Sequence, residues 1–223
     1  LKTSNPLLNW GKSLLYAALA IACFHLAYTS SKYPLVGLLI FGYAYGLVRL
    51  TDQPSVRRAF YFGLSVGFLC AAPQANFFWN IFGPAAIVLW LVFAFWIGLF
   101  TAIICGCARR WGKVKTAWLI PVVWTGLEYF RSELYYLKFS WLNIGYALPA
   151  KFDSFIGMYG IGFVVVLIAT VYINRHALKV ALKKCNSWTI IEFLIVLIIL
   201  LTFILLLRPA HSNRKSELEK IVN

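Results

Sequence analysis

The fold class follows from residues 84–107, which read PAAIVLWLVFAFWIGLFTAIICGC. This run carries no charged side chain, and a helix of about 20 apolar residues crosses the roughly 30 Å hydrocarbon core of a bilayer. The proline at its start suits the first turn of a helix, where no backbone donor is needed. The run therefore predicts a helix that spans a membrane.

Similar apolar runs recur along the chain and predict an all-α membrane protein, a bundle of about seven transmembrane helices. The predicted spans cover residues 13–28, 33–48, 59–82, 84–107, 116–130, 154–173 and 190–207. Pro73 and Pro121 lie inside two of these runs, where proline removes a backbone donor and bends a helix. We take residues 1–207 as one transmembrane domain, and residues 208–223 as an outer-side tail or a linker to a missing domain.

The composition agrees with a membrane protein. Of the 223 residues, 61% are hydrophobic and only 13% are charged, whereas a soluble domain carries about 25% charged residues. The net charge of +14 would suggest nucleic acid in a soluble protein. Here the basic residues lie in short loops between apolar runs, so we expect no nucleic-acid partner. The five cysteines form no disulfide or metal-ligand pattern, and we predict neither a metal nor a cofactor.

The Lys and Arg residues predict the orientation. With the N-terminus in the cytoplasm, the inside segments hold 13 of them and the outside loops hold 4. Since cytoplasmic loops are enriched in Lys and Arg, the N-terminus is predicted inside and the C-terminus outside a bacterial inner membrane. The first apolar run also has the basic flank of a signal peptide, but no small-residue cleavage site follows it.

Two further patterns concern packing and the membrane surface. Gly42 and Gly46, and likewise Gly63 and Gly67, are four residues apart, a spacing that lets helices approach closely in lipid. The outer segment 131–153 is rich in Tyr, Trp and Phe, which favour the membrane–water interface. We expect this segment to lie on, or dip into, the outer leaflet.

Residues 120–146, IPVVWTGLEYFRSELYYLKFSWLNIGY, carry the most information about function. On a helix, Trp124, Glu128 and Arg131 share one face. A carboxylate at the outer end of a span needs a partner, and Arg131 lies three residues away. The sequence leaves two roles open for this expected ion pair. It fixes the following loop, or it interacts directly with lipid.

These residues resemble the membrane domain of the apolipoprotein N-acyltransferases. The family has proline, Trp, Glu, Arg, an aromatic-x-Trp and Gly-Tyr in this order, matched here by Pro121, Trp124, Glu128, Arg131, Phe139, Trp141, Gly145 and Tyr146. Gly157, Tyr159, Gly160 and Phe163 are similar to a second motif, Gly-x-Tyr-Gly-x-Ser-Phe, in which Gly162 replaces the serine. We select Trp124, Glu128, Arg131, Phe139, Trp141, Gly145, Tyr146, Tyr159 and Gly160 as candidate lipid-binding or structural residues.

The resemblance implies an acyltransferase of lipoprotein biosynthesis, with membrane phospholipid and a lipoprotein as partners. In this family a Glu–Lys–Cys set in an extracytoplasmic nitrilase-like domain performs the chemistry. The residues of this chain offer no such set, so we predict no catalytic residue here and expect the chain to be inactive without that domain. It would seat phospholipid acyl chains and anchor the catalytic domain.

Two alternatives from other classes remain. The chain is an anchor for a separately encoded acyltransferase or polyprenol-linked glycosyltransferase, or it is a small transporter. Transporters place charged groups at mid-membrane and often contain repeats. Apart from Glu192 near the end of one run and His25 in the first, the sequence offers little of that pattern.

Overall fold

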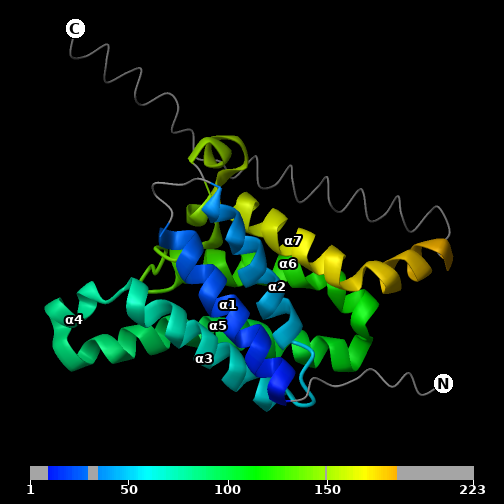
Figure 1. The fold of residues 1–223 in the computed structure, drawn as a ribbon, viewed down its shortest axis with the longest axis horizontal. Helices are drawn as coiled ribbons and strands as arrows, with labels where there is room; N and C mark the ends of the chain where they lie inside the picture. The colour runs from blue at the N-terminus through cyan, green and yellow to red at the C-terminus, as the bar shows by residue number, and fades with distance from the viewer. Residues whose placement is uncertain (1–9, 30–34, 149, 185–223) are drawn as a thin grey trace, which may run out of the picture. The chain divides into compact units, whose positions relative to one another are not determined.

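The computed structural model describes residues 10–29, 35–148 and 150–184, and all the regular secondary structure in these ranges is helical (Figure 1). The prediction of an all-α chain is thereby confirmed for these ranges. The run predicted at 190–207 and the tail at 208–223 lie outside them. The contacts described below all lie within Leu1–Lys179, the first of two units.

The helices follow one another with short connections. Their bounds are α1 Trp10–Thr29, η2 Val36–Leu39, α2 Ile40–Leu50, α3 Val56–Gln74, α4 Phe77–Phe82, η3 Gly83–Ala85, α5 Ala86–Trp111, α6 Lys113–Tyr129, η4 Phe130–Leu134, η5 Ile144–Ala147 and α7 Ala150–Lys184. Helix α7 is kinked at Gly157, whose φ of 72° is outside the helical region.

Three helical stretches among the described residues are long and apolar enough to cross a membrane. They are Trp10–Thr29, Phe77–Trp111 and Ile156–Leu178, with mean hydropathy values of 1.3, 2.6 and 2.3. Val36–Leu50 is a shorter apolar helix. The total of about seven spans therefore stays a prediction.

Glycines bring α3 and α5 into close contact. A Cβ atom added at Gly63 would lie 2.2 Å from Thr101 Oγ1, and one at Gly67 would lie 2.7 Å from Ala94 Cα. This proximity allows Thr101 Oγ1 to donate a hydrogen bond to the Ala59 carbonyl of α3 at 2.9 Å. The prediction that this glycine pair serves helix packing is confirmed.

The other glycine pair serves the contact between α1 and α2. A Cβ atom at Gly42 would lie 2.5 Å from Cys23 Sγ, and one at Gly46 would lie 2.8 Å from both Ala20 Cβ and the Tyr16 carbonyl. Since lipid tails are as apolar as most side chains, such close packing is a main source of helix association in a bilayer.

Helix α3 ends just after its internal proline. The run 59–82, predicted as one bent helix, is divided between α3, which ends at Gln74, and α4, which begins at Phe77. Pro73 lacks the N–H group that would continue the helical ladder. The Trp90 indole then donates to the Ala75 carbonyl at 3.1 Å, so α5 stabilises the turn between the two helices.

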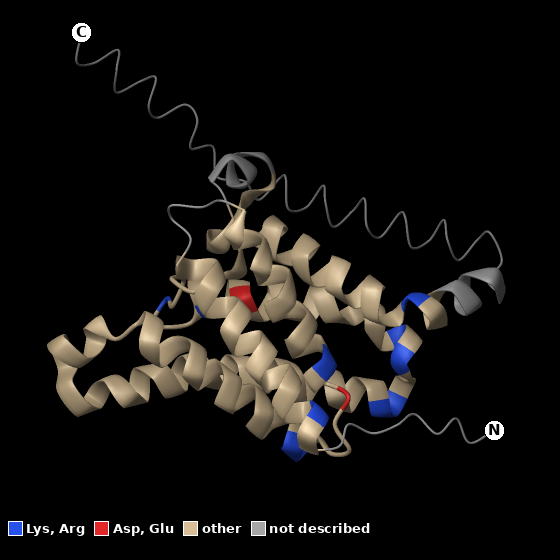
Figure 2. Cartoon of the chain, viewed as in Figure 1, with Lys and Arg blue, Asp and Glu red and all other residues tan. Residues whose placement is uncertain are grey.

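Most of the Lys and Arg residues in the described part of the chain gather at one end of the helices (Figure 2). We call this the basic end; it holds the connections from α2 to α3 and from α5 to α6. Asp52 lies there, 2.8 Å from Lys113 Nζ and 3.6 Å from Arg49 Nη1. Arg109 donates to the Pro54 carbonyl at 2.7 Å and fixes the same loop.

Candidate functional site

The candidate site lies at the end of α6 opposite the basic end. Helix α6 starts at Lys113 in the basic end and carries Glu128 in its last turn. It continues into η4, a π-helical turn that contains Arg131. Such π-helical turns are frequent at functional sites. Glu128 and Arg131 are only 3% and 2% exposed, so both charged groups need partners within the protein.

Those partners differ from the expected ones. The ion pairs within 4.0 Å in the described ranges both involve Asp52, and none joins Glu128 to Arg131. Instead, Glu128 Oε1 accepts a hydrogen bond from the Ile144 N–H group at 2.9 Å. Arg131 Nε donates to the Phe139 carbonyl at 3.0 Å. The expected direct ion pair is thus replaced by two side chains that bind the same loop, residues 139–144.

Asn143 connects the members of this polar cluster. Its Oδ1 accepts a hydrogen bond from Arg131 Nη2, and its Nδ2 donates to Ser132 Oγ at 3.0 Å. The Tyr28 hydroxyl of α1 donates to the Asn143 backbone carbonyl at 2.5 Å. Asn143 is completely buried. A buried polar network with most of its donors and acceptors paired specifies one loop conformation.

Two glycines make room for this network. A Cβ atom at Gly145 would lie 2.5 Å from the Met158 carbonyl, so the loop passes α7 at backbone distance. A Cβ atom at Gly162 would lie 2.7 Å from Glu128 Oε2. Glu128 Oε2 and the Trp124 indole N–H are buried next to each other beside Gly162, and neither forms a hydrogen bond to any other group in the described ranges.

The loop holds Trp141 against an aromatic cluster. The Trp141 ring stacks on Phe78 of α4, with centroids 5.3 Å apart and an interplanar angle of 28°. The Phe77 and Phe139 rings lie 5.6 and 5.7 Å from it. Trp141 nevertheless remains 54% exposed, whereas Phe139 is buried. Trp141 is therefore the outward-facing member of a packed aromatic group.

The remaining predicted residues have separate positions. Tyr146 is 52% exposed and lies in η5, just after the loop. The Tyr159 hydroxyl donates to Glu133 Oε1 at 2.6 Å and so connects α7 to η4. Gly160 is buried, and the side chain nearest to a Cβ there is Ile156 of its own helix. The structure thus brings Trp124, Glu128, Arg131, Phe139 and Gly145 together, while Gly160 lies apart from them.

Sequence reasoning missed several members of the cluster. Asn143 could have been found, because an asparagine within an aromatic segment at a membrane surface needs a specific partner. Phe93, whose ring lies 4.6 Å from the Arg131 guanidinium carbon, gave no signal among the many aromatics of its helix. Tyr28 is 115 residues from Asn143 and gave none either.

The arrangement serves positioning more than covalent chemistry. Glu128 Oε1 and the Arg131 guanidinium are hydrogen-bonded to the loop, and Cys23, Cys70 and Cys105 are buried. The described ranges contain no group of three His, Cys, Asp or Glu side chains that could hold a metal ion. What the cluster can do is hold an aromatic loop in one conformation at one end of an apolar bundle.

Fold and site together define an apolar helical domain, with helices able to span a membrane and a locked aromatic loop at one end. Residues 10–171 match the family described as the apolipoprotein N-acyltransferase N-terminal domain, and the chain belongs to this family. This confirms the resemblance seen in the sequence. A comparison with curated proteins found no match.

Proposed function

We propose that this chain is the membrane domain of an apolipoprotein N-acyltransferase-like protein, which seats phospholipid acyl chains and anchors an extracytoplasmic catalytic domain. Family membership supports the domain assignment. The single observation that carries the lipid role is the exposed Trp141, stacked on Phe78 and held by the loop that Arg131 and Glu128 bind. Aromatic rings of this kind favour the head-group level of a bilayer.

The orientation follows from the separation between the basic end and the aromatic loop. Helix α6 has 17 residues, which corresponds to about 25 Å at 1.5 Å per residue. With the basic end in the cytoplasm, the loop carrying Trp141 lies at the outer surface of an inner membrane. A catalytic domain on that surface would meet lipid at the aromatic cluster.

A reporter that fluoresces only in the cytoplasm tests this orientation. Fused after Lys115, at the basic end, it should be bright, and fused after Lys138, in the aromatic loop, it should be dark. The reverse result would place the loop in the cytoplasm and remove the proposed lipoprotein role.

Photo-crosslinking tests the lipid role. The chain is reconstituted with a phospholipid that carries a photoactivatable group near its head, and the cross-linked peptides are mapped by mass spectrometry. We expect cross-links on α4 and on the loop around Trp141, and at least a fivefold loss in Trp141→Ala. Trp111→Ala is the matched control, because Trp111 is 51% exposed at the basic end. Equal losses in both variants would refute a specific role for the aromatic cluster.

A further inference from the structure

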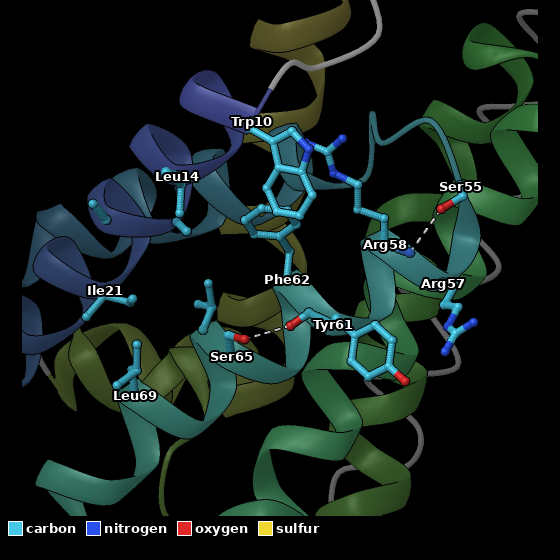
Figure 3. Close-up of a pocket in the computed structure, with 13 residues that line it drawn as sticks. Trp10, Leu14, Ile21, Ser55, Arg57, Arg58, Tyr61, Phe62, Ser65 and Leu69 are labelled. Atoms are coloured by element: carbon cyan, nitrogen blue, oxygen red, sulfur yellow. Dashed lines mark hydrogen bonds between the residues drawn. The ribbon is translucent and has the colours of Figure 1, made fainter.

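A second surface feature lies away from the aromatic loop, between α1 and α3. It is a groove of about 640 Å³ (Figure 3). Its lining side chains come from α1, from α3 and from the residue before α3, and include Trp10, Leu14, Ala18, Arg58, Ser65 and Leu69. This volume is in the range of sites that bind small molecules.

Most of the length of the groove is hydrocarbon surface. Leu14 and Ile21 line it from α1, and Leu69 lines it from α3. The Ser65 hydroxyl lies about halfway along the groove, and it donates a hydrogen bond to the Tyr61 carbonyl of its own helix at 2.8 Å. In a bilayer such a surface is covered by lipid tails rather than by water.

One end of the groove is cationic. Arg58 lies with its guanidinium carbon 4.0 Å from the centroid of the Trp10 ring, and Arg57 precedes it on α3. Arg58 Nη2 contacts Ser13 Oγ at 3.4 Å, but its Nε is buried with no hydrogen-bond partner in the described ranges. The ion pairs in these ranges both use Asp52, so neither arginine has a carboxylate partner there.

The length of the groove matches one leaflet. From Arg58 to Leu69 the helix advances 11 residues, or about 16 Å at 1.5 Å per residue. Half of the roughly 30 Å hydrocarbon core is about 15 Å. The guanidinium groups therefore lie at head-group level when the apolar walls extend towards the middle of the bilayer.

We propose that this groove binds an anionic phospholipid from the leaflet at the basic end. One acyl chain lies along α1 and α3, and the phosphate lies beside Trp10, where the Arg58 guanidinium binds it, since guanidinium groups bind phosphate through paired hydrogen bonds. Arg57, which lines the groove on the Tyr61 side, adds a second positive charge at this end. Negative lipids attract basic segments at the cytoplasmic surface. This site is at the opposite end from the aromatic loop and does not depend on the proposed function.

Native mass spectrometry of the full chain tests the proposal. Detergent-purified protein is mixed with equal amounts of phosphatidylglycerol and phosphatidylcholine that have the same acyl chains. We expect phosphatidylglycerol to be retained about tenfold more than phosphatidylcholine, and the preference to disappear in the double variant Arg57→Ala/Arg58→Ala. Arg110→Ala is the matched control, because it removes an exposed charge from the basic end outside the groove.

A second variant separates the groove from the charges. Ala18 is an exposed residue in the groove wall, and Ala18→Trp should fill the groove, leave the arginines in place and lower phosphatidylglycerol retention about tenfold. This variant decides the question if the double arginine variant does not fold. The proposal is overturned if Arg110→Ala loses as much lipid as the double variant. Unchanged retention in Ala18→Trp, or no lipid on the wild-type protein, would also overturn it.

Discussion

His25 Nε2 of α1 lies 3.0 Å from the Leu69 carbonyl oxygen of α3. Pro73, four residues after Leu69, has no N–H group to donate to that oxygen. The other imidazole nitrogen, His25 Nδ1, lies 3.2 Å from Gln74 Nε2, an amide donor. With a proton on Nε2, the ring supplies the hydrogen bond that the proline removes, which fixes the end of α3 against α1.

Loss of this hydrogen bond should destabilise the protein. His25→Ala removes this donor from the Leu69 carbonyl, at a cost of about 0.5–1.5 kcal/mol in the free energy of unfolding. Pro73→Ala restores a helical donor, so the double variant should lose less than the sum of the two single changes. Thermal unfolding in detergent measures all three. Additive losses would show that the histidine acts independently of the proline.

Arg131 should be irreplaceable by lysine. Its Nε and Nη2 groups donate to two different acceptors, Phe139 O and Asn143 Oδ1, and one ammonium group cannot reproduce this fork. We expect Arg131→Ala to lower the free energy of unfolding by about 3–6 kcal/mol, since each of two hydrogen bonds from a charged group contributes about 1.5–3 kcal/mol. Arg131→Lys should recover less than half of that loss.

Limited trypsin digestion measures the loop itself, through the rate of cleavage after Lys138. Both Arg131 variants should be cut at least tenfold faster there, while Arg110→Lys, at an exposed position, should not differ from wild type. Wild-type protection in Arg131→Lys would mean that the charge matters and the hydrogen-bond fork does not.

Alanine and serine at position 162 should differ in their effect on stability. Gly162→Ala places a carbon atom 2.7 Å from Glu128 Oε2 and should lower stability by about 1–3 kcal/mol. Gly162→Ser causes the same crowding but can donate a hydrogen bond to this carboxylate oxygen, which accepts none from the loop, so it should be the more stable of the two. Thermal unfolding in detergent decides the order.

Gly126→Ala is the control for this pair, because a Cβ atom there meets nothing within 4 Å. In an exposed helical setting this change stabilises by about 0.5–1 kcal/mol. A serine variant at position 162 that is less stable than the alanine variant would show that Glu128 Oε2 cannot accept the hydroxyl.

The cysteines should not become acylated. A thioester needs an activated thiolate near the lipid carbonyl, but Cys23, Cys70 and Cys105 are buried. Cys107 lies on α5, outside the lining of the groove between α1 and α3. We expect the intact mass of the chain to be unchanged after incubation with phospholipid. An added acyl mass that hydroxylamine removes at neutral pH, and that a Cys→Ser change abolishes, would contradict this.

The spacing of residues in the sequence predicted much of the fold and the charged residues of the candidate site. Gly63 and Gly67 indicated a close helix contact because four-residue spacing places them on one face. Their spacing could not identify Thr101 as the partner, since that depends on how α5 packs. Glu128 and Arg131 were recognised because buried charges need partners. The path of the loop that both side chains bind was not recognised, because it depends on tertiary contacts of Asn143 and on the φ of 43° at Lys138.

The contact between α3 and α5 has a consequence for what holds these helices together. A carbon atom added at Gly63 would lie 2.2 Å from Thr101 Oγ1, so the two backbones have no spare room. In a bilayer, lipid tails solvate an apolar helix as well as another helix does, so separating the pair would expose no apolar surface to water. The association of α3 with α5 therefore depends on close backbone approach. More hydrophobic side chains would add little affinity, while one extra carbon atom at Gly63 would push the helices apart.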